Sequence, residues 1–262
     1  MNFYCKSDTG LVRTNNEDYV ECLNHSWCNA SGTYQSVTLL LLADGMGGAA
    51  AGEFASMLAV KTTKGRTLEG LLQKSPEELL HSNFKEFFKK CFMEANKAIF
   101  EKSQSDPNCM GMGTTIVAGM IIRNNLTLGH VGDSRAYLFR NGQLKQITRD
   151  HSYVQELIDR KEITVEQAKN HPNKNIITRA LGVSSEVEPE LQELTLQEND
   201  LLLFCTDGLN GYVEDKTIEF NCKEFFNIGL ATVADKLISA AKLGGGGDNV
   251  SVVLYNPLPE NN

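Results

Sequence analysis

Four aspartates beside small residues, at the ends of strand-like apolar runs, restrict the fold of this chain more than any other feature. They are Asp44, Asp133, Asp207 and Asp248. Asp44 and Asp207 each follow an apolar run, Asp248 precedes one, and Asp133 lies between two. An unpaired charge is costly to bury, so a carboxylate at the mouth of a buried strand needs a partner. If the strand ends converge, a hard cation such as Mg²⁺ or Mn²⁺ between the carboxylates relieves their repulsion.

The turn after Asp44 is rich in glycine, with the sequence Gly-Met-Gly-Gly at 45–48. Glycine allows the backbone to approach a ligand closely, so the Gly45 carbonyl can add an oxygen ligand beside Asp44. No histidine or cysteine is adjacent to any of the four aspartates. This composition disfavours zinc and favours an oxygen-rich, partly hydrated metal site.

An acidic pair, Glu17-Asp18, closes an N-terminal stretch that also carries Arg13. A guanidinium beside a carboxylate metal site is suited to clamp a phosphate, because its fork matches two phosphate oxygens. Two metals bridged by one aspartate can hold a shared water and lower its pKa for attack on phosphorus. The motifs of the alternative covalent phosphatases, Cys-x5-Arg and Asp-x-Asp, are absent from the sequence.

Each of these settings also has a purely structural interpretation. Asp-Gly dipeptides at 44–45 and 207–208 are common turn formers. The glycines at 244–247 are also consistent with a flexible helix exit, and Asp133 with a turn carrying a local salt bridge to Arg135. Glu17-Asp18 can start a helix or cap a loop, and Arg13 can be a surface residue that pairs with Asp18. The combination of settings favours the metal site over these separate explanations.

Composition and charge exclude several classes of protein. The chain has 262 residues, 41% of them apolar and 22% charged, with a net charge of −8 and no basic tail, which argues against nucleic-acid binding. The start lacks the features of a signal peptide, and the longest apolar runs are too short to span a membrane. The seven cysteines are odd in number and contain no Cys-x-x-Cys. Reduced thiols in a cytoplasmic protein are therefore expected.

Apolar periodicity predicts strands alternating with helices. Strands are expected at 36–43, 114–122, 126–131, 135–140, 143–147, 201–206 and 250–255, with hairpin turns at 123–125 and 141–142. Helices are expected at 53–61, 151–159, 165–169 and 231–243, and a long amphipathic stretch at 76–103 has a capped start at Ser75. Residues 64–75 are expected to be a surface connection, and 170–182 a loop. Adjacent hairpins indicate antiparallel sheets with helices packed outside them.

The ordered set of short motifs resembles the metal-dependent serine/threonine protein phosphatases of type 2C, most closely their compact bacterial branch. The matching segments are 7–13 with 16–18, 43–48, 113–115, 132–135, 150–152, 177–182, 206–209 and 247–251. They cover nearly the whole chain in the order of the family. The resemblance implies an α+β fold in which two antiparallel sheets form a central sandwich with helices on both outer faces. It also implies a single domain over 1–262, with a flap at about 151–181 that influences substrate choice.

The resemblance further implies a role for each site residue. Asp44 would bridge two Mn²⁺ or Mg²⁺ ions, with Asp207 and Asp248 completing one shell. The Gly45 carbonyl and the Glu17-Asp18 carboxylates would serve the other ion, with Asp18 preferred to Glu17. Asp133, together with Asp207, would hold a weaker third ion. Asp44 and Arg13 are the expected catalytic residues, and Arg13 would bind the substrate phosphate.

One position departs from the animal branch of the family, in which a histidine, the proposed general acid, follows the Asp-Gly of the second motif. Here that position is Met46. A serine alkoxide is a poor leaving group and needs a proton. A metal-bound water is one candidate donor. His151 and His171 are candidates only through their position near the flap, and a structural role is the simpler interpretation of both.

The implied function is hydrolysis of phosphoserine and phosphothreonine in proteins, by a monomeric cytoplasmic enzyme. Its partners would be phosphorylated substrates of a cytosolic or membrane serine/threonine kinase, and the kinase itself. Two alternatives stay open. A catalytically silent phosphatase-like module would bind phosphoproteins, but such a module should have lost metal aspartates or the arginine. A metal phosphatase for small phosphorylated metabolites would share the same motifs, because they specify only the chemistry.

Overall fold

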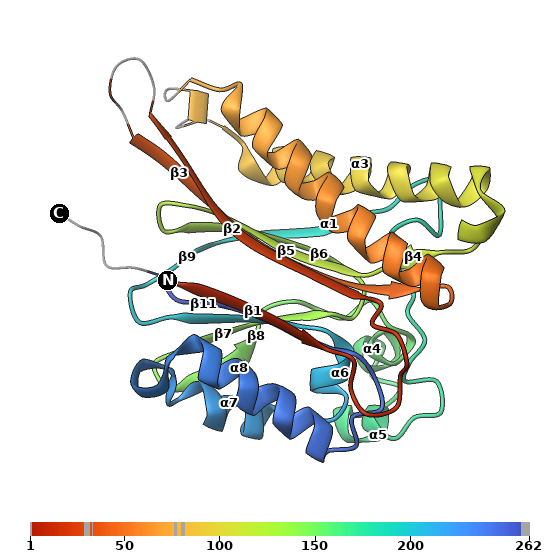
Figure 1. The fold of residues 1–262 in the computed structure, drawn as a ribbon. Coiled ribbons are helices and arrows are strands. Elements are labelled where there is room, and N and C mark those ends of the chain that lie inside the picture. Colours follow the sequence, from red (N-terminus) through yellow and green to blue (C-terminus); the bar gives the residue numbers. More distant parts are fainter. Residues whose placement is uncertain (1, 29–31, 33, 76–77, 80–81, 258–262) are drawn as a thin grey trace.

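The computed structural model describes residues 2–28, 32, 34–75, 78–79 and 82–257. Figure 1 shows four layers, in which two stacked β-sheets lie between two layers of helices. All the pairings that build the two sheets are antiparallel. This architecture confirms the predicted α+β sandwich.

The first sheet contains five strands in the order β1-β11-β10-β7-β8. Their bounds are Phe3–Asp8, Val250–Tyr255, Leu201–Cys205, Arg135–Arg140 and Gln143–Gln146. β10 and β11 are buried along their whole length, as their continuous apolar sequences predict. The first and last strands in sequence therefore lie side by side.

The second sheet follows the order β2-β3-β5-β6-β9, and a two-residue strand, β4, pairs with β3. The strands are β2 (Asp18–Cys28), β3 (Tyr34–Met46), β4 (Gly113–Thr114), β5 (Ile116–Ile122), β6 (Asn125–Val131) and β9 (Glu190–Thr195). Both predicted hairpins are present, because Ile122 pairs with Asn125 and Arg140 pairs with Gln143. At the second turn Asn141 and Gly142 have φ of 53° and 80°, as a two-residue Asn-Gly turn requires.

Apolar side chains fill the space between the sheets and the spaces beneath the helices. Leu40, Val117, Leu128 and Phe204 lie in the inter-sheet core. α1 (Ala49–Leu72) and α3 (Phe84–Ser105) cover the second sheet, whereas α7 (Asp215–Cys222) and α8 (Phe225–Leu243) cover the first (Figure 1). The inner core holds the two sheets together, so their strand ends have fixed relative positions.

α1 is longer than predicted, and the expected surface connection at 64–75 is wrong over most of its length. The helix continues to Leu72, and some of the polar residues in its second half are buried against the rest of the fold. Thr63 and Thr67 are fully buried, and the Thr67 hydroxyl donates to the Thr63 carbonyl at 2.7 Å. Such a bond satisfies the hydroxyl inside the helix. Small polar residues here pack like apolar ones.

The predicted amphipathic stretch at 76–103 is interrupted. Residues 82–83 are not helical, and the Asn83 side chain accepts a hydrogen bond from the Glu86 N–H at 3.0 Å to begin α3. Ser75 and Glu78 exchange the two bonds of the predicted capping box, at 2.7 and 3.2 Å. Residues 76–77 and 80–81 of the predicted stretch lie outside the described residues.

The segment between β8 and β9 carries two short helices, α4 (Tyr153–Asp159) and α5 (Val165–Lys169). Its ends are joined, because Tyr153 N–H donates to the Ile176 carbonyl and Thr178 N–H to the His151 carbonyl. A 3₁₀ turn (Pro107–Cys109) follows α3, and α6 (Asp207–Asn210) follows β10. α8 begins before the predicted position and is kinked at Gly229, which has φ of 79°. Among the described residues, no helix combines the length and apolarity needed to cross a membrane.

Candidate metal centre

The sheets bring the predicted aspartates to one end of the sandwich. The β2–β3 register places Asp18 directly opposite Asp44. Asp207 begins α6 immediately after β10, and Asp248 stands two residues before β11, the neighbour of β10. The carboxyl groups of Asp44 and Asp207 are within hydrogen-bonding reach of each other. Side chains from both sheets therefore converge, as the sequence predicts.

The carboxyl groups of Asp18, Asp44 and Asp207 have raised pKa values because they are buried together. Burial raises the pKa of Asp18 to about 7, although hydrogen bonds from Ser251 and Thr206 act to lower it. Burial and then the charge of Asp248 raise the pKa of Asp207 to about 6. Burial and the charges of Asp18 and Asp207 hold the pKa of Asp44 well above its usual range. At neutral pH this cluster needs a cation to be fully ionised.

Two carboxylate oxygens in the cluster have no hydrogen-bond partner in the part of the chain that the structure describes. Oδ1 of Asp18 and Oδ1 of Asp133 are buried and accept no hydrogen bond among the described residues. In contrast, Oδ2 of Asp18 accepts hydrogen bonds from the hydroxyls of Thr206, at 2.9 Å, and Ser251, at 2.6 Å. A buried, unpaired carboxylate oxygen is costly in an apoprotein and is what a hard cation requires. The donor set therefore fits Mg²⁺ or Mn²⁺.

Asp133 lies on a short loop between β6 and β7 that is held from two sides. Gly132, with φ of 108°, donates its N–H to Nδ1 of His151 at 3.0 Å and accepts from the His151 N–H at 2.9 Å. The hydroxyls of Ser134 and Thr115 are 2.7 Å apart. Burial and the charge of Asp207 raise the pKa of Asp133 to about 7. The local salt bridge of the structural alternative for this turn is not found among the described residues, because Arg135 instead binds Asp150 through two nitrogens.

Asp44 and Gly45 are fixed through their backbone. The Asp44 carbonyl accepts from the Thr115 N–H at 2.9 Å and the Thr114 hydroxyl at 2.7 Å, while the Asp44 N–H donates to the Thr115 hydroxyl at 3.1 Å. Gly45 packs so closely on α1 that a Cβ there would lie 2.0 Å from the Gly52 carbonyl oxygen. Only glycine fits at this position, next to the cluster.

The Glu17 carboxylate lies against the start of α1. A Cβ added to Gly52 would be 1.8 Å from Oε2 of Glu17. The Glu17 carbonyl accepts from the Gly45 N–H at 3.1 Å and the Ser56 hydroxyl at 2.6 Å. Burial raises the pKa of Glu17, opposed by the charge of Arg13. The acidic pair neither starts a helix nor caps a loop, because Asp18 begins strand β2.

Arg13 lies at the same end of the molecule. It pairs with Asp248, whereas the structural alternative was a surface arginine paired with Asp18. Its Nη2 is 2.9 Å from Oδ2 of Asp248, not bonded to Asp18. The side chain is 52% exposed, so the rest of the fork is open to solvent. The negative charges of Asp248, Glu17 and Asp207 all help to raise its pKa.

Three residues that support the cluster were not predicted from the sequence. The Asn249 side chain accepts from the Glu17 N–H at 2.9 Å and donates to the carbonyls of Thr9 and Asn15, which fixes the N-terminal loop. Thr206 and Ser251 orient Asp18, as described above. All three stand within three residues of Asp207 or Asp248, so adjacency in the motifs was the available signal.

The histidines near the flap do not have the features of proton donors. His151 is buried, and burial, together with neighbouring positive charge, lowers its pKa to about 4. It stacks on His130 with ring centroids 4.7 Å apart. These two histidines and Glu190 have ligand atoms close enough for a cation, but the guanidinium of Arg179 lies 3.1 Å from Nε2 of His151 and would repel one. A structural role explains this cluster.

Neither His171 nor Met46 is placed to act as a proton donor at the cluster. Nδ1 of His171 accepts a hydrogen bond from the Asn173 N–H at 3.1 Å, within its own loop. The Met46 methyl group lies beside Gly113, where Val183 also packs. A thioether has no proton to donate, so Met46 cannot act as a general acid at the position that a histidine has in the animal branch.

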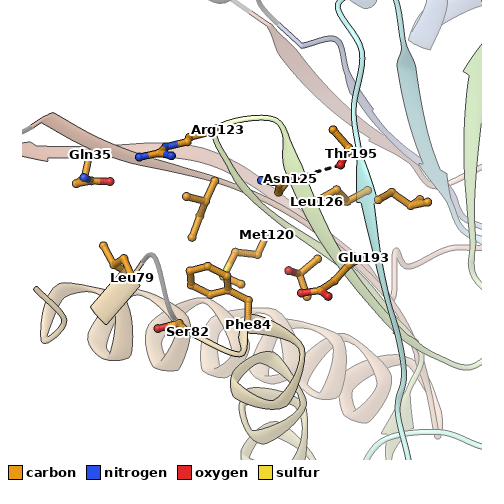
Figure 2. A pocket seen from close by; sticks show the side chains of 13 residues that line it. Gln35, Leu79, Ser82, Phe84, Met120, Arg123, Asn125, Leu126, Glu193 and Thr195 are labelled. Carbon is orange, nitrogen blue, oxygen red and sulfur yellow. Dashed lines mark hydrogen bonds between the residues drawn. The ribbon is translucent and has the colours of Figure 1, made fainter. Parts of the chain in front are cut away.

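A separate cavity of about 510 Å³ lies on the helix-covered face of the second sheet. It opens where α3 begins, beside the ends of β5, β6 and β9, and Phe84 and Met120 face each other within it (Figure 2). Arg123 and Glu193 also line the cavity. None of the clustered aspartates lines it, so it is not the metal centre.

Comparisons with known proteins agree with this architecture. Residues 14–241 match the family Protein phosphatase 2C. The serine/threonine protein phosphatase PstP of Mycobacterium tuberculosis is 40% identical over 97% of this chain, and the alignment spans 44% of the length of that relative. The serine/threonine phosphatase Stp of Listeria welshimeri is 36% identical, over 97% of this chain and 95% of the relative.

A solved structure extends the likeness to the fold. The catalytic domain of serine/threonine protein phosphatase PstP in complex with two manganese ions superposes with a TM-score of 0.79 and 37% identity, over 98% of this chain and 97% of the other. The match of the family over most of the sequence, and these identities over nearly the full chain, show the affiliation. The chain belongs to the protein phosphatase 2C family.

Proposed function

We propose that this chain is a serine/threonine protein phosphatase that hydrolyses phosphoserine and phosphothreonine with the help of Mn²⁺ or Mg²⁺. The observation that carries the proposal is the convergence of buried aspartates with unpaired oxygens beside an exposed arginine. Such a site binds cations on one side and a phosphate on the other. Relatives that are named serine/threonine phosphatases support the substrate class.

The clustered residues would hold two ions. Asp44 would lie between them, with Asp207 and Asp248 on one side. The Gly45 carbonyl and Asp18, with Glu17 behind them, would serve the other side, and Asp133 would hold a weaker third ion. When bound, the ions supply a water acidic enough to attack phosphorus at neutral pH and offset the charge of the phosphoryl group.

The protein itself supplies position and charge. Thr206 and Ser251 hold Asp18 by Oδ2, so Oδ1 is directed into the site. Asn249 fixes the backbone at Glu17 to the loop that carries Asp248. Arg13 would bind two phosphoryl oxygens with the part of its fork that Asp248 leaves open, and would orient phosphorus for in-line attack.

The proposal extends to the substrates, the compartment and the domain organisation of the enzyme. The substrates would be proteins phosphorylated by a serine/threonine kinase, including the kinase itself, and the enzyme would act in the cytoplasm as a monomer. All seven cysteines are free thiols, as a reducing compartment favours. The chain would act as one domain over 1–262, and the segment at about 151–181 would be its flap, because paired backbone bonds close its two ends beside the loop of Asp133.

Hydrolysis of a phosphothreonine peptide tests the proposal. The chelated protein should be inactive and should recover with Mn²⁺, whereas Asp44→Asn and Asp207→Asn should lose at least a hundredfold in kcat. Asp235→Asn is the matched control, since Asp235 is an exposed aspartate on α8 paired with Lys6. Full activity in a chelator would contradict the metal mechanism. Activity on small phosphate esters alone would favour a metabolite phosphatase, and phosphopeptide binding without hydrolysis would favour a silent module.

A further inference from the structure

Three exposed apolar side chains stand around the arginine of the site. Leu11 and Val12 immediately precede Arg13 and are 62% and 68% exposed. Tyr212, in the turn after α6, is 37% exposed. Large apolar side chains exposed together on a rim of polar groups are typical of binding surfaces. We call Leu11, Val12 and Tyr212 the apolar lip.

The lip is built on the glycine loop that leads to Asp248. The Leu11 N–H donates to the Gly246 carbonyl at 2.8 Å, and a Cβ at Gly246 would lie 2.9 Å from Cγ of Leu11. The Tyr212 ring would be 3.4 Å from a Cβ at Gly245, and its hydroxyl 2.3 Å from a Cβ at Gly247. Glycines therefore let Leu11 and Tyr212 close on the loop from two sides. The lip and Asp248 share one support.

The lip carries no charge of its own. Behind the loop, Lys242 is paired with Asp8 at 3.0 Å, and Asp8 also accepts from the Gly10 N–H. Arg13 is paired with Asp248. The Tyr212 hydroxyl makes no hydrogen bond within the part of the chain that the structure describes. Leu11, Val12 and Tyr212 therefore form an uncharged surface beside Arg13, and the charges of Lys242 and Arg13 are paired. Thr14 and Asn15, the exposed residues that follow Arg13, are polar and uncharged.

The distance from Arg13 limits what the lip can touch. Leu11 and Val12 are two residues and one residue from Arg13, so their Cα atoms lie within about 7 Å of its Cα atom along the chain. A phosphate held by Arg13 would place neighbouring substrate residues over the lip. A small phosphorylated metabolite would leave the lip uncovered.

We propose that the apolar lip is a substrate-docking surface for polypeptides, which binds an apolar side chain within one or two positions of the phosphorylated residue. This rests on the proposed phosphatase function and adds a sequence preference to it. An apolar neighbour would bury part of Leu11, Val12 and the Tyr212 ring, while an acidic neighbour would find no positive partner on the lip. The lip would thereby favour peptides over small esters.

Matched phosphothreonine peptides test this proposal. They differ only in the residues adjacent to phosphothreonine, which are leucine or valine, serine, or glutamate, and p-nitrophenyl phosphate is the small-ester reference. With Mn²⁺, the unmodified protein should show kcat/KM about fivefold higher for apolar than for serine neighbours, mainly through KM, as partial burial of an apolar group gives. Glutamate neighbours should be the poorest substrates.

Substitutions in the lip should remove the preference. Val12→Ser is the first choice, because its exposed side chain contributes little to folding, and Leu11→Ser and Tyr212→Ser complete the set. Each should bring the ratio of apolar to serine peptides below about twofold. Tyr212→Phe should keep the preference, since the ring supplies the contact. Phe220→Ser on α7, which removes an equally exposed apolar side chain, should also keep it.

Two results overturn the proposal. One is an unmodified protein that hydrolyses all the peptides equally well. The other is a full preference in Val12→Ser, Leu11→Ser and Tyr212→Ser, with Mn²⁺ affinity intact. If the unmodified protein hydrolyses no phosphopeptide with Mn²⁺, the proposed function itself fails, which separates that failure from failure of the lip.

Discussion

The Ser251 hydroxyl donates a hydrogen bond of 2.6 Å to Oδ2 of Asp18, although the two residues are 233 positions apart in sequence. Ser251 is the second residue of β11, in the first sheet, and Asp18 is the first residue of β2, in the second. The bond therefore joins the two sheets at the candidate metal centre. It also fixes which oxygen of Asp18 faces the site.

Ser251→Ala should weaken Mn²⁺ binding by about 10- to 100-fold, the usual cost of losing a group that orients a metal ligand. Thermal unfolding should show that the protein still folds. Ser105→Ala is the control, because Ser105 is exposed at the end of α3 and bonds only to its own helix. Equal Mn²⁺ affinity in Ser251→Ala and the unmodified protein would exclude the orienting role.

Gly52→Ala tests the part played by Glu17. The new methyl group would collide with Oε2 of Glu17 and displace that carboxylate. We expect weaker Mn²⁺ binding by about tenfold or more if Glu17 supports the site. Gly65→Ala is a matched control in the same helix, because its Cβ would meet open space. It should leave metal binding unchanged and stabilise the protein by roughly 0.5–1 kcal/mol.

The pH dependence of metal stabilisation follows from the raised pKa values. Asp18 and Asp207 have folded pKa values of about 7 and about 6, above the unfolded value of 3.8. In the metal-free protein their contribution to stability is greatest below pH 4 and is lost as pH rises through 6 to 7. A bound cation reverses this loss, because it needs the ionised carboxylates.

The gain in Tm on adding Mn²⁺ to chelated protein should therefore increase from pH 5.5 to pH 7.5. Differential scanning calorimetry with and without Mn²⁺ measures this gain. His151, with its lowered pKa of about 4, stabilises the fold as pH rises through 4 to 6.5, but it does so equally in both samples and cancels in the difference. A gain that is constant or falls with pH would contradict the carboxylate cluster as the binding site.

Arg13→Ala should raise KM for a phosphothreonine peptide by about tenfold and weaken inhibition by inorganic phosphate in proportion. Arg13→Lys should recover only part of the loss, because lysine keeps the charge but not the planar fork. Steady-state kinetics of both variants provides the check. Unchanged KM and kcat in Arg13→Ala would mean that its pair with Asp248 is only structural.

The sequence predicted the strands with continuous apolar runs but missed three of the four strands at the sheet edges, whereas the fourth, β8, was predicted from its Asn-Gly turn. β3, β10 and β11 read directly from their continuous apolar runs. β1, β2 and β9 were not predicted, because their polar residues, such as those in Asp18–Cys28, face solvent on one side. The second half of α1 was missed for a related reason, since Thr63 and Thr67 are polar residues that the fold buries.

For the site, the sequence indicated the residues but not the contacts between them. The aspartates and Arg13 stand in short motifs, so sequence alone could propose them as one site. It could not show that Arg13 pairs with Asp248 or that Ser251 bonds to Asp18, because both contacts depend on how the N-terminal segment lies against the strands of the first sheet. The tyrosine of the lip likewise became apparent only from its position on the glycine loop.

Mn²⁺ stoichiometry tests the central claim, a shared site for two ions bridged by Asp44, most directly. Equilibrium dialysis of chelated, desalted protein against increasing Mn²⁺ at pH 7.5 should give two ions per chain before any weaker third ion appears. Asp44→Asn should retain no more than one. Saturation of the unmodified protein at a single ion, or two undiminished ions in Asp44→Asn, would contradict the account.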